Sequence, residues 1–199
     1  LFYRPERSGT GITLPGLRSK LFGLLNISLE YRMIQGSYIP QFFDQAYDLN
    51  RVVSITNDNK TIINTKDMSV FSDYDDSWAS SGLFGSANLN LFDIVNFTAS
   101  YASMTADTVE YNSFNSVLHI NTDNIPKLSA ANAFYRRNND KNPFDFANPS
   151  ENTVMGYRVG YEMSKGVSLI WEYSEFYRDD GTGKLEPVKQ TKIETAFSF

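Results

Sequence analysis

From residue 20 to the end of the chain, apolar side chains recur at every second position. Residues 20–33 show the pattern most clearly, because Ile27, Leu29, Tyr31 and Met33 alternate with polar or charged side chains such as Glu30. This period of two is typical of a β-strand, whose successive side chains point to opposite faces of a sheet. None of the positions on the apolar faces is charged. Eight segments are predicted as strands in this way: residues 20–33, 83–91, 95–101, 114–120, 128–137, 155–163, 167–174 and 192–199.

Composition narrows the class of β protein. The 199 residues carry a net charge of −5, which argues against nucleic-acid binding because such proteins usually present a basic face. The chain has no cysteine and one histidine, so we expect no disulfide, no zinc site built from several histidines and no cofactor. No apolar run approaches the ~20 residues of a membrane-spanning helix. A soluble β protein and a transmembrane β-barrel therefore remain.

Three features favour the barrel over a soluble β-sandwich, which also alternates apolar and polar side chains. The connections at 92–93, 122–126 and 164–166 are short, whereas those at 35–80, 105–111, 138–152 and 178–190 are long, as periplasmic turns and external loops are. The chain also ends within an alternating strand. Aromatic side chains of the apolar faces lie toward the long connections, at positions typical of a membrane interface: Tyr31, Tyr101, Tyr135, Tyr157, Trp171 and Tyr173. A secreted or surface-exposed sandwich that acts as a binding module is the alternative.

The last strand resembles the C-terminal strand of Gram-negative outer-membrane β-barrel proteins. Those proteins end in an aromatic residue that follows apolar residues at alternate positions, a pattern matched by Ile193, Phe197 and Phe199 and more weakly by Thr195. The resemblance implies an antiparallel, all-β transmembrane barrel in the outer membrane, in contact with lipid and lipopolysaccharide. It also implies that the barrel-assembly machinery reads Ile193, Phe197 and Phe199 during biogenesis.

About eight strands are visible, and the N-terminal region leaves two kinds of barrel open. Pro15-Gly16 is interpreted as a periplasmic turn, so residues 1–19 are either the end of a preceding strand or a periplasmic lead. Residues 20–199 then form an eight-stranded barrel, or the C-terminal part of a larger one that is completed by further strands or another membrane chain. In the long external loop at 35–80, residues 51–56 and 61–65 are predicted to form a hairpin too short to cross a bilayer; if it crossed, the count would be ten.

The second face of the predicted strands carries charges of both signs, which would face the barrel interior. In a narrow barrel they would pair as a salt-bridged plug, and in a wider barrel they would line a path for solutes. We therefore expect a structural or porin-like outer-membrane protein and not an enzyme. The lumen-facing candidates are Glu30, Arg32, Arg158, Glu162, Glu172, Lys192 and Glu194.

Two further groups of polar residues are not expected to form a catalytic or metal site. His119 is predicted to face the interior while Ser116 lies on the opposite face, so we expect no catalytic pair. Asp73, Asp75 and Asp76 cluster in the external loop without the central glycine and closing glutamate of a calcium-binding loop. They indicate a solvated loop and not a metal site.

Overall fold

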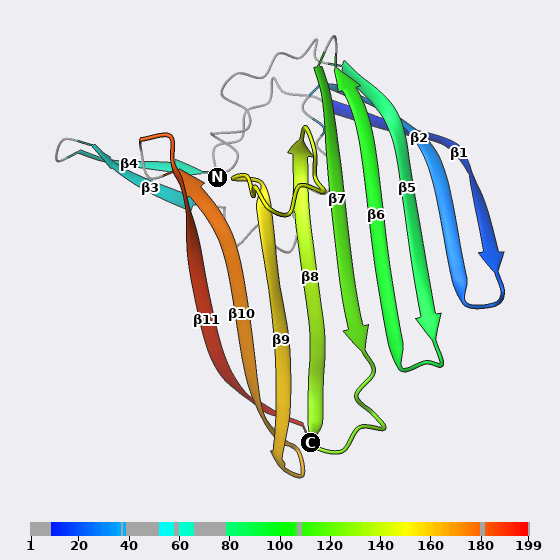
Figure 1. The fold of residues 1–199 in the computed structure, drawn as a ribbon, viewed down its shortest axis with the longest axis vertical. Helices are drawn as coiled ribbons and strands as arrows, with labels where there is room; N and C mark the ends of the chain where they lie inside the picture. The colour runs from blue at the N-terminus through cyan, green and yellow to red at the C-terminus, as the bar shows by residue number, and fades with distance from the viewer. Residues whose placement is uncertain are drawn as a thin grey trace.

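The computed structural model describes residues 9–36, 38, 52–57, 60–65, 79–106, 109–179 and 182–198. Nine strands form one curved antiparallel sheet in the order β1-β2-β5-β6-β7-β8-β9-β10-β11 (Figure 1). The prediction of an all-β, antiparallel fold is thereby confirmed. The strands are β1 (Gly9–Leu21), β2 (Leu25–Gly36), β3 (Val52–Asn57), β4 (Lys60–Thr65), β5 (Ala79–Leu91), β6 (Val95–Ala106), β7 (Val109–Ile120), β8 (Leu128–Asp140), β9 (Thr153–Ser164), β10 (Val167–Asp179) and β11 (Leu185–Phe197).

The nine-stranded sheet is open. β1 and β11 form its two edges and do not pair with each other, so the described strands do not close into a barrel. Figure 1 shows these two strands at opposite sides of the sheet. The sheet also has one strand more than the eight predicted, because residues 9–21 pair with β2 along their length.

The interpretation of Pro15-Gly16 as a turn is wrong. β1 continues through these residues with a shift in register between Leu14 and Leu17, and the turn to β2 lies at residues 22–24. Residues 20–33 are therefore two strands and not one. The alternation continues through the turn because Leu21 and Leu25 are cross-strand partners on the same face, an even number of positions apart.

Two connections that were predicted to be long are short. β6 ends at Ala106 and β7 begins at Val109, while β10 ends at Asp179 and β11 begins at Leu185. The ladders continue to these ends, with Ala106 opposite Val109 and Asp179 opposite Leu185. Backbone pairing does not depend on the apolar alternation, which breaks here because apolar side chains lie on the face opposite Tyr101 and Tyr173: Ala102, Met104, Ala106 and Phe176. The short turns near 92–93, 122–126 and 164–166 are confirmed.

The predicted hairpin in the long connection is also confirmed. β3 and β4, of six residues each, form a separate two-stranded sheet that pairs with no described strand of the main sheet. A tenth strand in the main sheet is thus not formed by this segment. Among the described residues, no helix is long and apolar enough to span a membrane.

The described part of the chain buries few large apolar side chains. The main buried cluster joins Val154 and Phe176 with the partly buried Phe134 and Val188. It lies near the end of the sheet that carries the β8–β9 and β10–β11 connections, which we call the loop end. The opposite end, with the turns at 22–24, 92–94, 121–127 and 165–166, is called the turn end and lies at the bottom of Figure 1.

Candidate functional site

The register of the sheet places the predicted apolar faces of all the strands on one side. Leu29 lies opposite Gly85, which lies opposite Tyr101, and Tyr101 lies opposite Phe114. On the other half of the sheet, Ala133, Tyr157, Tyr173 and Thr191 are successive partners. Because directly opposed residues point to the same side of a sheet, these rows define one apolar face and one polar face. The predicted phase of the strands is confirmed.

The apolar face is the more exposed of the two. On β2, Leu29 and Tyr31 are 46% and 39% exposed, whereas the side chain of Glu30 between them is only 15% exposed. Large side chains further along the apolar face are similarly open, among them Val159, Trp171 and Ile193. No described segment covers this face between the turn end and the row of tyrosines described next. The distribution is the reverse of that in a water-soluble sheet, which buries its apolar face.

Aromatic side chains form a belt across the apolar face, on the loop-end side of its middle. Tyr157 stacks on Tyr173 with ring centroids 5.3 Å apart. The tyrosine hydroxyls bond toward the loop end: Tyr31 donates to Ser81 at 2.9 Å, and Tyr101 donates to Asn112 at 2.7 Å. Tyrosine prefers membrane interfaces for this reason, since its ring can sit in an apolar layer while its hydroxyl reaches polar groups. The belt comprises the six predicted residues Tyr31, Tyr101, Tyr135, Tyr157, Trp171 and Tyr173.

The β8–β9 connection adds two phenylalanines to the belt that sequence reasoning missed. The ring of Phe144 lies 5.6 Å from that of Tyr101 and 4.8 Å from that of Phe114, and Phe146 meets Tyr135 edge-on at 5.1 Å. Alternation cannot find these residues, because they lie outside the strands. The sequence signal that could have found them is the pair of phenylalanines beside Pro143 in an otherwise polar loop.

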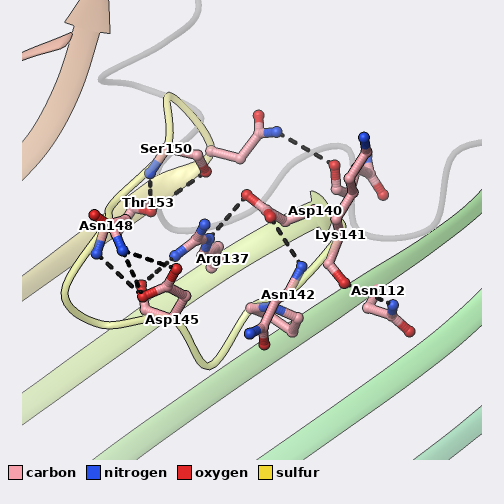
Figure 2. A network of polar contacts seen from close by, with 12 residues as sticks. Asn112, Arg137, Asp140, Lys141, Asn142, Asp145, Asn148, Ser150 and Thr153 are labelled. Atoms are coloured by element: carbon pink, nitrogen blue, oxygen red, sulfur yellow. Dashed lines mark hydrogen bonds and ion pairs between the residues drawn. The ribbon is translucent and has the colours of Figure 1, made fainter.

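Figure 2 shows how the same connection is held over the sheet. Arg137 donates to the Asp140 carboxylate at 2.8 Å and to the Asp145 carbonyl oxygen at 2.6 Å, and Asp145 in turn accepts from Asn148. Burial alone would raise the pKa of Asp140, but hydrogen bonds from Arg137, Ser150 and the backbone of Asn142 lower it to about 2. Asp140 is thus a charged anchor for the loop.

The polar face gathers most of the predicted lumen-facing residues into two clusters near the sheet edges. In the first, Glu30 lies 3.6 Å from Arg18 and 3.2 Å from Arg32, and Arg32 also lies over the ring of Phe84. In the second, Arg158 lies 3.8 Å from Glu172 and 3.5 Å from Glu194, which also pairs with Lys192.

Glu162 lies on the same face of β9 as Arg158 but outside both clusters. It forms no ion pair with any residue that the structure describes. It is therefore the candidate whose charge is least offset by neighbours.

Between the clusters, the polar face carries several small polar side chains and Arg136, which donates to Asn115 at 2.8 Å. Ser28 bonds to Ser86 at 2.7 Å, and Asn88 donates to Thr98 at 2.8 Å. His119 lies in this region opposite Asn96 and Asn132, while Ser116 belongs to the apolar face. The two residues are on opposite sides of the sheet, as predicted from their spacing.

The remaining predicted positions have different outcomes. Ile193 and Phe197 lie exposed on the apolar face of β11, at 59% and 63% exposure. Phe199 and the aspartates 73, 75 and 76 lie outside the described residues. Within the described ranges, no group of three or more acidic or histidine side chains is placed to hold a metal ion. Comparisons with protein-family models, curated proteins and solved structures found no match.

Proposed function

We propose that this chain contributes nine strands to a β-barrel of the Gram-negative outer membrane. In this proposal the apolar face contacts lipid, the polar face lines the interior, and the belt lies at the external interface with lipopolysaccharide. The observation that carries the proposal is the reversed distribution of side chains, with the exposed face apolar and the more enclosed face charged.

Charged residues on the apolar face support the proposed position of the membrane. Glu110, Arg137, Glu175 and Lys189 share this face with the belt, and all four lie on its loop-end side. From the belt to the turn end, the apolar face carries no charge in the described strands. A charge-free band bounded by aromatic side chains is the expected signature of a barrel wall.

A β-sandwich would need a second layer over the apolar face. The other sheet in the described residues is the β3–β4 hairpin, whose two strands of six residues are too small to cover nine strands. The hydroxyls of Tyr31 and Tyr101 also donate to Ser81 and Asn112 of the same sheet, and not to a second layer packed on the apolar face.

The barrel is closed, in this proposal, by further strands that pair with the free edges of β1 and β11. Every residue of β1 is exposed, and edge strands with unpaired backbone groups are templates for pairing. Single-chain bacterial barrels have an even number of strands, so nine strands require at least one more. These strands belong to another part of the protein or to another membrane chain.

The interior residues suit a structural role in the barrel wall. In a wide barrel they would also line a porin-like path for solutes. Ion pairs around Arg158 and Glu30 fix the register of the strands near the two edges. We further propose that Ile193 and Phe197 are read by the barrel-assembly machinery, because both are exposed at alternate positions of the edge strand β11.

The proposal is tested by the dependence of the protein on detergent. We expect a monodisperse protein in detergent alone, and an unheated sample that migrates differently from a heated one on a denaturing gel, because a closed barrel resists the detergent of the gel. A stable, monodisperse monomer in plain buffer would contradict the proposal.

A further inference from the structure

The turn end of the sheet carries two phenylalanines in an unusual backbone conformation. Phe22 has φ 52° and Phe92 has φ 53°, in the left-handed region that glycine and asparagine favour. Each is the first of the two central residues of a four-residue β-turn, because the Leu24 amide donates to the Leu21 carbonyl and the Ile94 amide donates to the Leu91 carbonyl. A turn with positive φ at both central residues ordinarily selects Asn-Gly. An aromatic residue here is not explained by the requirements of the turn.

Packing does not explain these residues either. Phe22 is 93% exposed and Phe92 is 82% exposed, more than any other large apolar side chain in the described ranges. Leu24, Ile94 and Ile125 beside them are also exposed, at 39%, 47% and 36%. The three turns that carry these residues join β1 to β2, β5 to β6 and β7 to β8, strands that are contiguous in the sheet. We call Phe22, Leu24, Phe92, Ile94 and Ile125 the turn-end patch.

The two hairpins repeat the same arrangement. Residues 21–28 and 91–98 align as Leu-Phe-Gly-Leu-Leu-Asn-Ile-Ser and Leu-Phe-Asp-Ile-Val-Asn-Phe-Thr, and Tyr31 and Tyr101 follow their phenylalanines by nine positions. Six of these nine steps, from Leu25 to Tyr31 and from Val95 to Tyr101, are strand and extend about 20 Å, which a tilt of 35–45° reduces to about 14–16 Å across a membrane. The apolar band of an outer-membrane barrel is about 25 Å tall. The strands thus separate the patch from the belt by more than half of the height of such a band, before the turns and their side chains are counted.

We propose that the turn-end patch inserts into the periplasmic lipid interface, so that these turns anchor the sheet in the membrane and do not project into water. The inference rests on the proposed function. It adds that the turn-end patch marks the periplasmic boundary of the membrane and that the turns contact lipid. Aromatic side chains flank the apolar band of such barrels at both interfaces, and lipid contact accounts for two exposed phenylalanines that their turns do not require.

The test is depth-dependent fluorescence quenching in the full-length protein, reconstituted in phosphatidylcholine vesicles. Bromine atoms are placed either near the carbonyl end or near the methyl end of the acyl chains. Trp78→Phe and Trp171→Phe together remove the native tryptophans, and Phe22→Trp and Phe92→Trp are then introduced separately. A variant with only Trp78→Phe keeps Trp171 as a reporter of lipid contact by the apolar face. Asp123→Trp, at an exposed polar position of the β7–β8 turn, is the control at the same end.

We expect Phe22→Trp and Phe92→Trp to be quenched more by bromines near the carbonyl end than by those near the methyl end. Trp171 should be quenched by brominated lipid, and Asp123→Trp should not. If Trp171 is quenched but both turn variants are not, the patch lies in water or on a periplasmic protein, and the inference fails while the proposed function stands. Equal quenching of Asp123→Trp would likewise overturn it, by showing nonspecific contact of the whole turn end. If Trp171 is also unquenched, the proposed function fails as well.

Discussion

At the scale of single residues, neighbouring side chains of one strand experience opposite surroundings. Glu30 sits between two arginines on the polar face, while Leu29 and Tyr31 beside it are open on the apolar face. A buried carboxylate needs such partners, because an unpaired charge away from water is costly. The same rule applies at the loop end, where Arg137 and Asp140 are both enclosed and satisfy each other.

Asp140 gives a prediction for acid pH. Its folded pKa of about 2 lies below the ordinary value of 3.8, so its charged form stabilises the fold. This contribution is complete above about pH 4 and is lost as the pH falls from there toward 2. Asp140→Asn should therefore lower the free energy of unfolding by about 1–2 kcal/mol at pH 7, and should show a smaller loss of stability between pH 4 and 2 than the wild type.

Urea unfolding followed at several pH values measures both effects. Asp123→Asn, which changes an exposed carboxylate in the β7–β8 turn, is the matched control and should behave as the wild type. If Asp140→Asn keeps the acid sensitivity of the wild type, the carboxylate is not the anchor of the loop.

At the scale of the strands, two glycines of β5 differ in the space around them. A Cβ atom at Gly82 would collide with the backbone oxygen of Ser103 and lie 2.7 Å from the Cα atom of Met104, both on β6. At Gly85, the nearest atom would be the Ser28 backbone oxygen at 3.7 Å, an ordinary contact. Gly82 therefore permits a close approach of β5 and β6, whereas Gly85 does not.

We expect Gly82→Ala to destabilise the folded protein by about 1–3 kcal/mol, because the strands must separate to admit the methyl group. Gly85→Ala should be neutral or slightly stabilising, since it only restricts the unfolded chain. Denaturant midpoints of the two variants in the same detergent compare them directly. Equal midpoints would show that β5 and β6 are not packed as closely as the structure has them.

Sequence alternation predicts which side of each strand is apolar, because one face of the sheet is apolar and successive side chains of a strand point to opposite faces. It does not predict where a strand ends when apolar side chains change face near that end, as they do beyond Tyr101 on β6 and beyond Tyr173 on β10. Alternation also missed the turn at 22–24, because apolar residues stay at every second position through the turn: Leu21 and Leu25 lie on the same face. The belt was predictable from its tyrosines, but Phe144 and Phe146 reach it through loop packing that has no period.

At the scale of the whole molecule, the charged residues of the polar face differ in how far their charges are offset. Glu172 and Glu194 share Arg158, and Lys192 adds a second cation to Glu194. Glu162 has no described ion-pair partner. In a conducting barrel, an unpaired carboxylate on the wall should attract cations more strongly than one held in a pair.

Replacing these residues therefore separates a porin-like path from a structural wall. In planar bilayers, we expect Glu162→Gln to lower the cation preference of single-channel currents more than Glu172→Gln does, as measured by the reversal potential in a salt gradient. A change with Glu172→Gln alone would mean that its pairing with Arg158 does not persist in the membrane. A barrel that shows no current steps at any voltage would exclude a porin-like path and leave the structural role.

The contact of the apolar face with lipid is tested most directly by two arginine substitutions on β6. Ala99 and Ser100 are adjacent and similar in size, but Ala99 lies opposite Ala87 and Ser116 on the apolar face, whereas Ser100 lies opposite Ser86 and Asn115 on the polar face. The measurement is the free energy of unfolding of each variant from lipid vesicles. We predict a loss of ~2–4 kcal/mol for Ala99→Arg, because its charge would face the hydrocarbon core, and a much smaller loss for Ser100→Arg. Equal losses, or a larger loss for Ser100→Arg, would contradict a lipid-facing apolar side.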